Sequence, residues 1–347
     1  MTGAYFRALL LAIFLFSLPL SGQAAPFSDI FVFGDSLSDN GNLYLVLGDT
    51  TPTPISGNDF IPSLPYDRGT DLLPALSNGR TWVEQLADKL GLDLTPSLAG
   101  GNDYAFGGAR MAPSGNPSTP PSVREQVGMF LNEIDITTGP DAPADALYSV
   151  WGGGNDARDA AVAVLTSGDA QAAFPFISAY VDSLAASIEA LAAEGAKNIL
   201  VPNIPDIGKT PAILAAGPQA SSLVGTMTAG FNAEAGTMLA SLQKTLNINL
   251  IDFDTFGLIN YTVSHPGATG FEDISNACAV NPDCLADADA TFFWDGIHPT
   301  EAGHSAIVQA VSLQPLPEPA TILLLVPGLA ATMLLRGRSR RKGYPAG

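Results

Sequence analysis

The chain has 347 residues with 34 acidic and 15 basic side chains, which gives a formal net charge of −19. A surface this acidic repels phosphate groups, so a nucleic-acid-binding function is excluded. The middle of the chain is long enough for a sizeable core and contains no linker, and we expect one globular domain over residues 26–315.

The N-terminal end has the layout of an export signal. Residues 8–20 form a short apolar run behind Arg7, and small residues lead from there to Pro26. The run is short for a mature membrane helix, which needs about 20 apolar residues. We predict a signal peptide over residues 1–24, cleaved after Ala24, with an uncleaved anchor as the alternative.

Strand-like and helix-like segments alternate along the domain. Apolar runs indicate buried strands within 29–35, 146–156, 197–206 and 247–255, the second of them ending in glycines. Helical periodicity covers 79–91, 179–196, 227–246 and 299–312. Pro299 is expected in the first turn of the last helix. This alternation predicts a central parallel sheet covered on both faces, that is, a three-layer α/β/α sandwich.

Two polar segments interrupt this alternation. Residues 48–79 and 112–122 are rich in proline, glycine and small polar residues. Loops of this length are uncommon unless they serve a site or are disordered. Residues 48–79 are therefore a possible lid over a site, with disorder as the alternative.

The two cysteines lie close together. Cys278 and Cys284 are the only cysteines of the chain. Because an export signal precedes the domain, a loop-closing disulfide is the preferred interpretation. A metal site would need further ligands nearby, and neither a second cysteine pair nor a close histidine is present. We predict no metal site and no cofactor.

The C-terminal end combines three features in order. Pro317-Glu318-Pro319 precedes an apolar stretch at about 320–335, and a basic tail follows. Such a segment stops in a membrane with its basic side toward the cytoplasm. Residues 316–347 resemble a PEP-CTERM sorting signal, which implies an exosortase-like processing enzyme as partner. We expect the protein to be exported to the cell surface or extracellular matrix, or to be anchored in a membrane through this segment.

Residues with catalytic chemistry follow the predicted strands. An exposed serine, Ser36, comes directly after the first strand, Asn155 follows the second, and Asp295 precedes His298 by three residues. Ligands of open parallel sheets bind beyond the carboxyl ends of the strands. A serine nucleophile needs a base, usually histidine, and the histidine needs a partner to fix its tautomer. We predict Ser36 as nucleophile, His298 as general base and Asp295 as the residue that orients it.

Attack by a serine creates an oxyanion, which needs hydrogen-bond donors already in place. The backbone N–H of Ser36 and the side-chain amide of Asn155 are two such donors. A glycine of the block at 102–109 can supply a third N–H, because glycine allows close approach of the backbone. Gly-Asp-Ser alone is often only a polar turn, so the prediction depends on the combination of blocks.

Four short blocks occur in a fixed order: Gly34-Asp35-Ser36-Leu37, residues 102–109, Gly154-Asn155-Asp156 and Asp295-Gly296-Ile297-His298. Over about residues 29–312 the chain thereby resembles the GDSL esterases and lipases, also called SGNH hydrolases. The resemblance implies a flavodoxin-like α/β/α sandwich and catalysis by the serine, aspartate and histidine just described. It implies an oxyanion hole formed by Ser36, Asn155 and one glycine, for which we favour Gly107 over Gly108.

The expected function is that of a secreted or surface-sorted serine esterase or lipase that hydrolyses carboxylic esters through an acyl-enzyme. The family resemblance implies lipids, short-chain esters or acylated carbohydrates as substrates. Two alternatives stay open at this point. One is an acyltransferase on the same fold, and the other is a non-catalytic surface module that binds matrix or exopolysaccharide.

Overall fold

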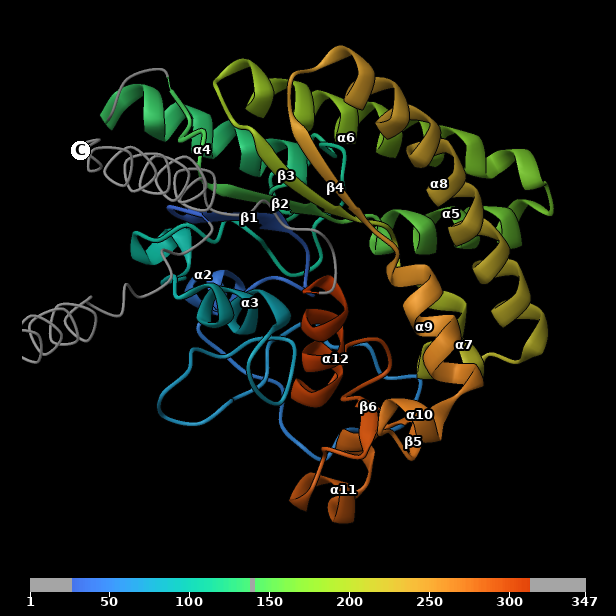
Figure 1. The fold of residues 1–347 in the computed structure, drawn as a ribbon. Helices are drawn as coiled ribbons and strands as arrows, with labels where there is room; N and C mark the ends of the chain where they lie inside the picture. The colour runs from blue at the N-terminus through green and yellow to red at the C-terminus, as the bar shows by residue number, and fades with distance from the viewer. Residues whose placement is uncertain (1–26, 138–140, 313–347) are drawn as a thin grey trace, which may run out of the picture. The chain divides into compact units, whose positions relative to one another are not determined.

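The computed structural model describes residues 27–137 and 141–312. The predicted signal peptide and the C-terminal sorting segment lie outside the described residues. Four parallel strands form the central sheet, in the order in which they occur along the chain (Figure 1): β1 (Ile30–Gly34), β2 (Leu147–Trp151), β3 (Asn198–Pro202) and β4 (Asn249–Phe253). All four strands lie within the predicted segments, and their carboxyl ends meet at one edge of the sheet.

Helices connect the strands and cover the sheet. The longer ones are α3 (Trp82–Leu90), α4 (Val123–Thr137), α5 (Gly154–Ser167), α6 (Phe174–Ala193), α8 (Pro218–Thr245), α9 (Thr255–Ser264) and α12 (Glu301–Val311). The short ones are α2 (Asn42–Leu47), α7 (Pro211–Ala215), α10 (Pro266–Thr269) and α11 (Pro282–Ala286).

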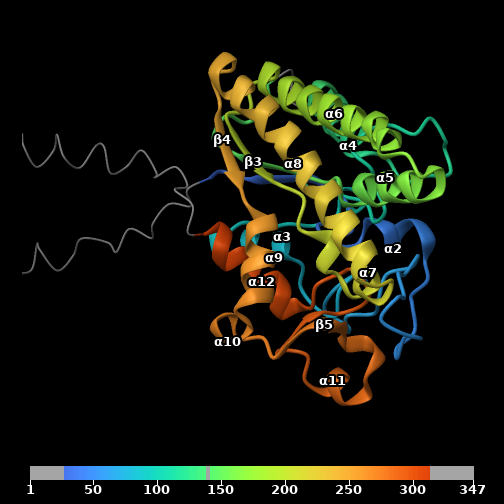
Figure 2. The ribbon, with the colours of Figure 1, turned by 90° about the vertical axis from the view of Figure 1, so that its right-hand side faces the viewer.

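Alternating side chains of the strands separate the two helical layers. Phe31 and Phe33 of β1 pack in one core cluster with residues of α4, α6 and α8. Ile30 and Val32 point to the opposite face and pack with residues of α3 and α12. Figures 1 and 2 show the two groups of helices on opposite sides of the sheet. The predicted three-layer α/β/α architecture is confirmed.

Helix α6 combines length with an apolar composition. By these two properties alone, Ala170–Ala193 qualifies as a membrane span among the described residues. One side of the helix is nevertheless buried, with Tyr180, Leu184, Ile188 and Leu191 packed in the same core cluster as the sheet. Such packing is typical of a core helix in a globular domain.

A second, two-stranded parallel sheet was not predicted. It consists of β5 (Asp273–Ala277) and β6 (Thr291–Phe293), both short and partly polar. Cys278 and Cys284 form a disulfide in the connection between them. The backbone N–H of Ala279 donates to the carbonyl of Trp294 at 2.8 Å. The small sheet and its disulfide therefore support the segment that carries Asp295 and His298.

The observed helices begin at other residues than predicted, and the starts of α8 and α12 have a clear physical cause. Helix α8 begins at Pro218, nine residues earlier than expected, because proline after Gly217 is a suitable first helical residue. Helix α12 begins at Glu301, and the Thr300 hydroxyl caps it by accepting the Gly303 N–H at 3.0 Å. Pro299 thus lies before the helix and not in its first turn.

The segment 48–79 is an ordered loop packed on the domain. Ile55 and Tyr66 are buried. The Arg68 guanidinium is fully buried and forms an ion pair with Glu84 at 2.7 Å. It also donates to three backbone carbonyls. These contacts rule out the disordered alternative for this loop.

Candidate active site

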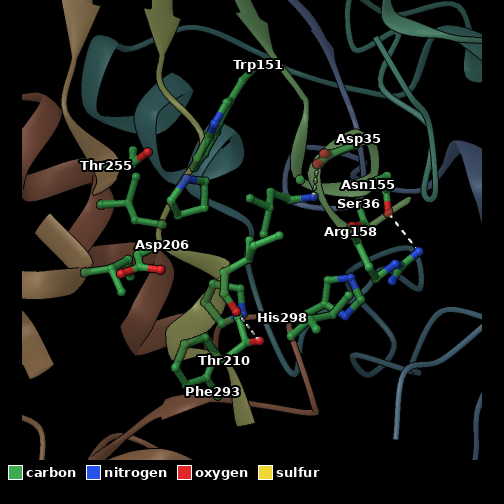
Figure 3. A pocket seen from close by; sticks show the side chains of 18 of the residues that line it. Asp35, Ser36, Trp151, Asn155, Arg158, Asp206, Thr210, Thr255, Phe293 and His298 are labelled. Carbon is green, nitrogen blue, oxygen red and sulfur yellow. Dashed lines mark hydrogen bonds between the residues drawn. The ribbon is translucent and has the colours of Figure 1, made fainter. Parts of the chain in front are cut away.

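Ser36 lies just beyond the carboxyl end of β1. A Cβ atom on Gly34 would stand 2.8 Å from the carbonyl oxygen of Trp151, so the tight approach of β1 and β2 requires glycine there. Ser36 is only 8% exposed and lines a pocket together with Asn155 and His298 (Figure 3). The serine is therefore recessed in a pocket wall, whereas the sequence suggested an exposed position.

His298 and Asp295 form a buried hydrogen-bonded pair. Nδ1 of His298 lies 2.8 Å from Oδ2 of Asp295. The backbone N–H groups of Ile297 and His298 both donate to Oδ1, each at 2.8 Å. With the carboxylate as acceptor, Nδ1 carries the hydrogen and Nε2 of the neutral ring carries the lone pair. Among the described residues, this Nε2 has no hydrogen-bond partner.

Tyr66 is a contributor to the site that the sequence did not reveal. Its hydroxyl donates to Oδ2 of Asp295 at 3.1 Å, across a sequence separation of 229 residues. The aspartate thus accepts two backbone and two side-chain hydrogen bonds. No local pattern around Tyr66 marks it, because the contact exists only once the loop 48–79 packs against the C-terminal segment.

The glycine block reaches the site by pairing with the free edge of β1. The Tyr104 N–H donates to the carbonyl of Val32 at 2.8 Å, and the Phe106 N–H donates to that of Gly34 at 3.2 Å. This pairing carries the following glycines alongside the end of β1, where Ser36 lies.

Asp39 determines which glycine N–H is available. Gly107 donates its N–H to Oδ2 of Asp39 at 2.7 Å, so this donor is committed and does not suit the oxyanion role expected for it. Within the described residues, the Gly108 N–H makes no hydrogen bond. Gly108 also has a φ of 80°, a conformation that favours glycine.

Asn155 lies in the first turn of α5, and both ends of its amide are held. Its Nδ2 donates to the carbonyl of Ala109 at 2.9 Å, and its Oδ1 accepts from Arg158 at 3.2 Å. The preceding Gly153 has a φ of 110°, and a Cβ there would lie 2.5 Å from the Tyr180 ring. The glycines before Asn155 thus allow the close turn that brings the amide to the pocket.

Two buried carboxyl groups next to the site have raised pKa values. Burial raises the pKa of Asp35 to about 6, although the Leu37 N–H and the charges of His298 and Arg158 oppose this shift. Burial also raises the pKa of Asp156 to about 6. Both groups therefore bind a proton more tightly in the folded protein than in the unfolded chain, so at neutral pH they destabilise the fold.

We expect Asp35→Asn to stabilise the protein at high pH only. The stability associated with the raised pKa is present below the unfolded value of 3.8 and is lost as pH rises through about 6. The amide should therefore raise the free energy of unfolding by about 2–3 kcal/mol at pH 8 and by little at pH 3.5. Urea unfolding at both pH values measures this, with exposed Asp59→Asn as control. A gain of equal size at both pH values would contradict the assignment.

A second histidine, His304, lies in the interior of the domain, shortly after His298 in the sequence. His304 of α12 is fully buried, and neither ring nitrogen has a hydrogen-bond partner among the described residues. Burial lowers its pKa to about 3, so the ring is neutral at physiological pH. Within residues 27–137 and 141–312, no three His, Cys, Asp or Glu side chains are grouped as metal ligands.

Comparison with known proteins finds sequence relatives and similar solved structures for this chain. An uncharacterized protein from the trpE-trpG intergenic region of Pseudomonas putida is 28% identical over 363 residues, covering 94% of this chain but only 56% of that protein. A GDSL esterase/lipase of Arabidopsis thaliana is 28% identical over 316 residues, covering 82% of this chain and 88% of that protein. Among solved structures, an acetylxylan esterase from Geobacillus stearothermophilus matches with 15% identity and a TM-score of 0.37, covering 83% of this chain and 94% of that one.

The sequence model of one family covers nearly the whole described domain. Residues 30–311 match the GDSL-like Lipase/Acylhydrolase family. The matched range contains all four sequence blocks and ends in α12. The chain therefore belongs to the GDSL-like lipase/acylhydrolase family.

Proposed function

We propose that this protein is an exported serine hydrolase that cleaves carboxylic esters through an acyl-enzyme. The observation that carries the proposal is the Asp295–His298 pair: His298 lines the same pocket as Ser36, and its Nε2 has no hydrogen-bond partner among the described residues. A serine next to such a base is the arrangement needed for nucleophilic catalysis. The family assignment supports ester bonds as the target.

In the proposed reaction, Oγ of Ser36 attacks the ester carbonyl carbon and transfers its proton to Nε2 of His298. Asp295 stabilises the imidazolium that forms. The negative charge on the carbonyl oxygen is met by the N–H groups of Ser36 and Gly108 and by the Asn155 amide. Collapse of the intermediate expels the alcohol, which takes the proton from His298. A water molecule then attacks the acyl-enzyme by the same route and releases the acid.

The pocket supports an apolar acyl group as part of the substrate. Its space is about 910 Å³ including the open mouth. Much of its wall beyond the serine is aliphatic or aromatic, including Leu37, Trp151, Ile213, Leu258 and Phe293. Burial of an acyl chain against such side chains is favourable by about 0.8 kcal/mol per CH₂ group.

A chain-length series of p-nitrophenyl esters tests the proposed function. We expect turnover with a maximum at the acyl length that fills the apolar pocket. We also expect an initial burst of one nitrophenolate per site wherever deacylation is the slower step. Product analysis with an added alcohol or sugar would detect acyl transfer in place of hydrolysis. Absence of turnover across the series by folded protein would refute the proposal.

The export part of the proposal depends on the two ends of the chain. The signal-peptide pattern at 1–24 and the PEP-CTERM-like segment at 316–347 support surface sorting, with an exosortase-like enzyme as partner. Fractionation of the producing cells checks this proposal. We expect the protein in the surface or extracellular fraction, and recovery from the cytoplasm alone would contradict it.

A further inference from the structure

A cationic side chain forms part of the pocket wall beside the proposed nucleophile. Arg158 lies on α5, one turn after Asn155, and lines the same pocket as Ser36. Figure 3 shows Arg158 on the side of the pocket where Ser36 and Asn155 lie, with Asp206 on the other side. The guanidinium therefore stands close to the place where the proposed reaction occurs.

Arg158 forms no ion pair within the described residues. Among the described residues, its Nη2 donates to the Asn155 amide oxygen at 3.2 Å. The adjacent Asp159 is held by two nitrogens of Arg110, at 2.9 and 3.1 Å. Asp35, which also lines the pocket, accepts a backbone N–H instead. Most N–H donors of the Arg158 guanidinium therefore stay unused.

Two other arginines of the domain that are partly or fully buried form ion pairs with carboxylates. Arg68 is paired with Glu84 at 2.7 Å, and Arg110 is paired with Asp159. Burial lowers the pKa of Arg158, which reflects the energetic cost of keeping its charge there. Buried charges are normally paired, and a chain with a net charge of −19 has many carboxylates to offer. Asp159 and Asp35 act on this guanidinium electrostatically without forming an ion pair with it, so its unused N–H donors suit an anionic group of a ligand.

We propose that Arg158 binds an anionic group, a phosphate or carboxylate, on the alcohol part of the ester substrate. This inference rests on the ester hydrolase function proposed above. The apolar wall takes the acyl chain, which leaves the alcohol part on the side of Arg158. Guanidinium binds two oxygens of a phosphate or carboxylate with parallel hydrogen bonds. Among the described residues that line the pocket, Arg158 is the one lysine or arginine, so an anionic group is expected on its side.

A pair of esters with the same acyl chain isolates this contact. The probes are 4-nitrophenyl butyrate and 3-carboxy-4-nitrophenyl butyrate, and the readout is the ratio of their kcat/KM values. In the full chain with Arg158→Gln, the preference for the anionic ester should fall about ten- to hundredfold relative to wild type, because a hydrogen-bonded charge pair is lost. Arg124→Gln, which removes an exposed arginine outside the pocket, should leave the ratio unchanged.

The ratio also separates charge recognition from a structural effect. Both esters are measured on the same preparation, so partial unfolding or a misplaced Asn155 amide lowers both rates alike. An equal loss for both esters with an unchanged ratio would overturn the proposal.

A second readout does not require turnover. Binding of phenyl phosphate, measured by calorimetry on the full chain, should be weakened at least about tenfold by Arg158→Gln and not by Arg124→Gln. Equal binding by wild type and Arg158→Gln, or no binding by either, would overturn the proposal. If the wild type hydrolyses neither ester, the proposed esterase function fails, while the calorimetric result still decides whether the anion site exists.

Discussion

Ser36→Ala should lower kcat for p-nitrophenyl esters by about 10⁵–10⁶-fold and leave the fold intact. The alanine removes only the nucleophilic oxygen. The surrounding turn is unaffected, because it is held by the N–H groups of Ser38 and Asp39, which both donate to the carbonyl of Asp35. Steady-state kinetics and a thermal melt measure the two quantities.

Ser38→Ala is the matched control for this experiment. Ser38 is also buried, but its hydroxyl accepts the Trp82 indole N–H at 3.1 Å and does not line the pocket. Its loss should cost about 1–2 kcal/mol of stability, with kcat changed only a few-fold. If Ser36→Ala kept its activity within tenfold of wild type, the nucleophile would have to be another residue.

Asp295→Asn should lower kcat by about 10⁴-fold. One amide atom keeps accepting from the backbone N–H groups of Ile297 and His298, so the side chain stays anchored through its oxygen. The NH₂ group then faces His298 Nδ1 where a carboxylate oxygen lay at 2.8 Å. A donor in that position forces the ring to accept at Nδ1 and to carry its hydrogen on Nε2. The histidine then cannot take the proton of the serine.

Tyr66→Phe distinguishes this tautomer effect from a general disturbance of the aspartate. It removes the hydrogen bond from the hydroxyl to Oδ2 of Asp295, which is 3.1 Å long, and leaves the charge in place. We expect roughly a tenfold loss of kcat. If Asp295→Asn lost no more activity than Tyr66→Phe, tautomer control by the carboxylate would be disproved.

The elements that the sequence predicts correctly are those with local signals. The four main strands are short apolar runs, and α3, α6 and α12 show helical periodicity. Strand alternation alone is enough for the three-layer fold and for placing Ser36 and Asn155 at the same edge of the sheet. The Asp295–His298 contact is also local, since both residues belong to one tight turn between β6 and α12.

The features that the sequence does not reveal depend on contacts between distant segments. Asp39 accepts the N–H of Gly107 across a separation of 68 residues, and this contact decides which member of the glycine doublet has a free N–H. The sequence Gly107-Gly108 alone does not indicate which of the two N–H groups is free. Tyr66 and Arg158 likewise acquire their relevance only from the side chains that the fold places beside them.

The loop 48–79 also has a consequence for when activity arises during synthesis. Through Tyr66 it holds Asp295, and through the Ser77 hydroxyl, which donates to the carbonyl of Pro299 at 3.0 Å, it holds the start of the last helix. Contacts of such long sequence separation form late in folding. A growing chain therefore carries its serine for most of translation without a working base. Under the proposed function, the chain can act on esters only once the C-terminal end of the domain has been made and has docked against this loop.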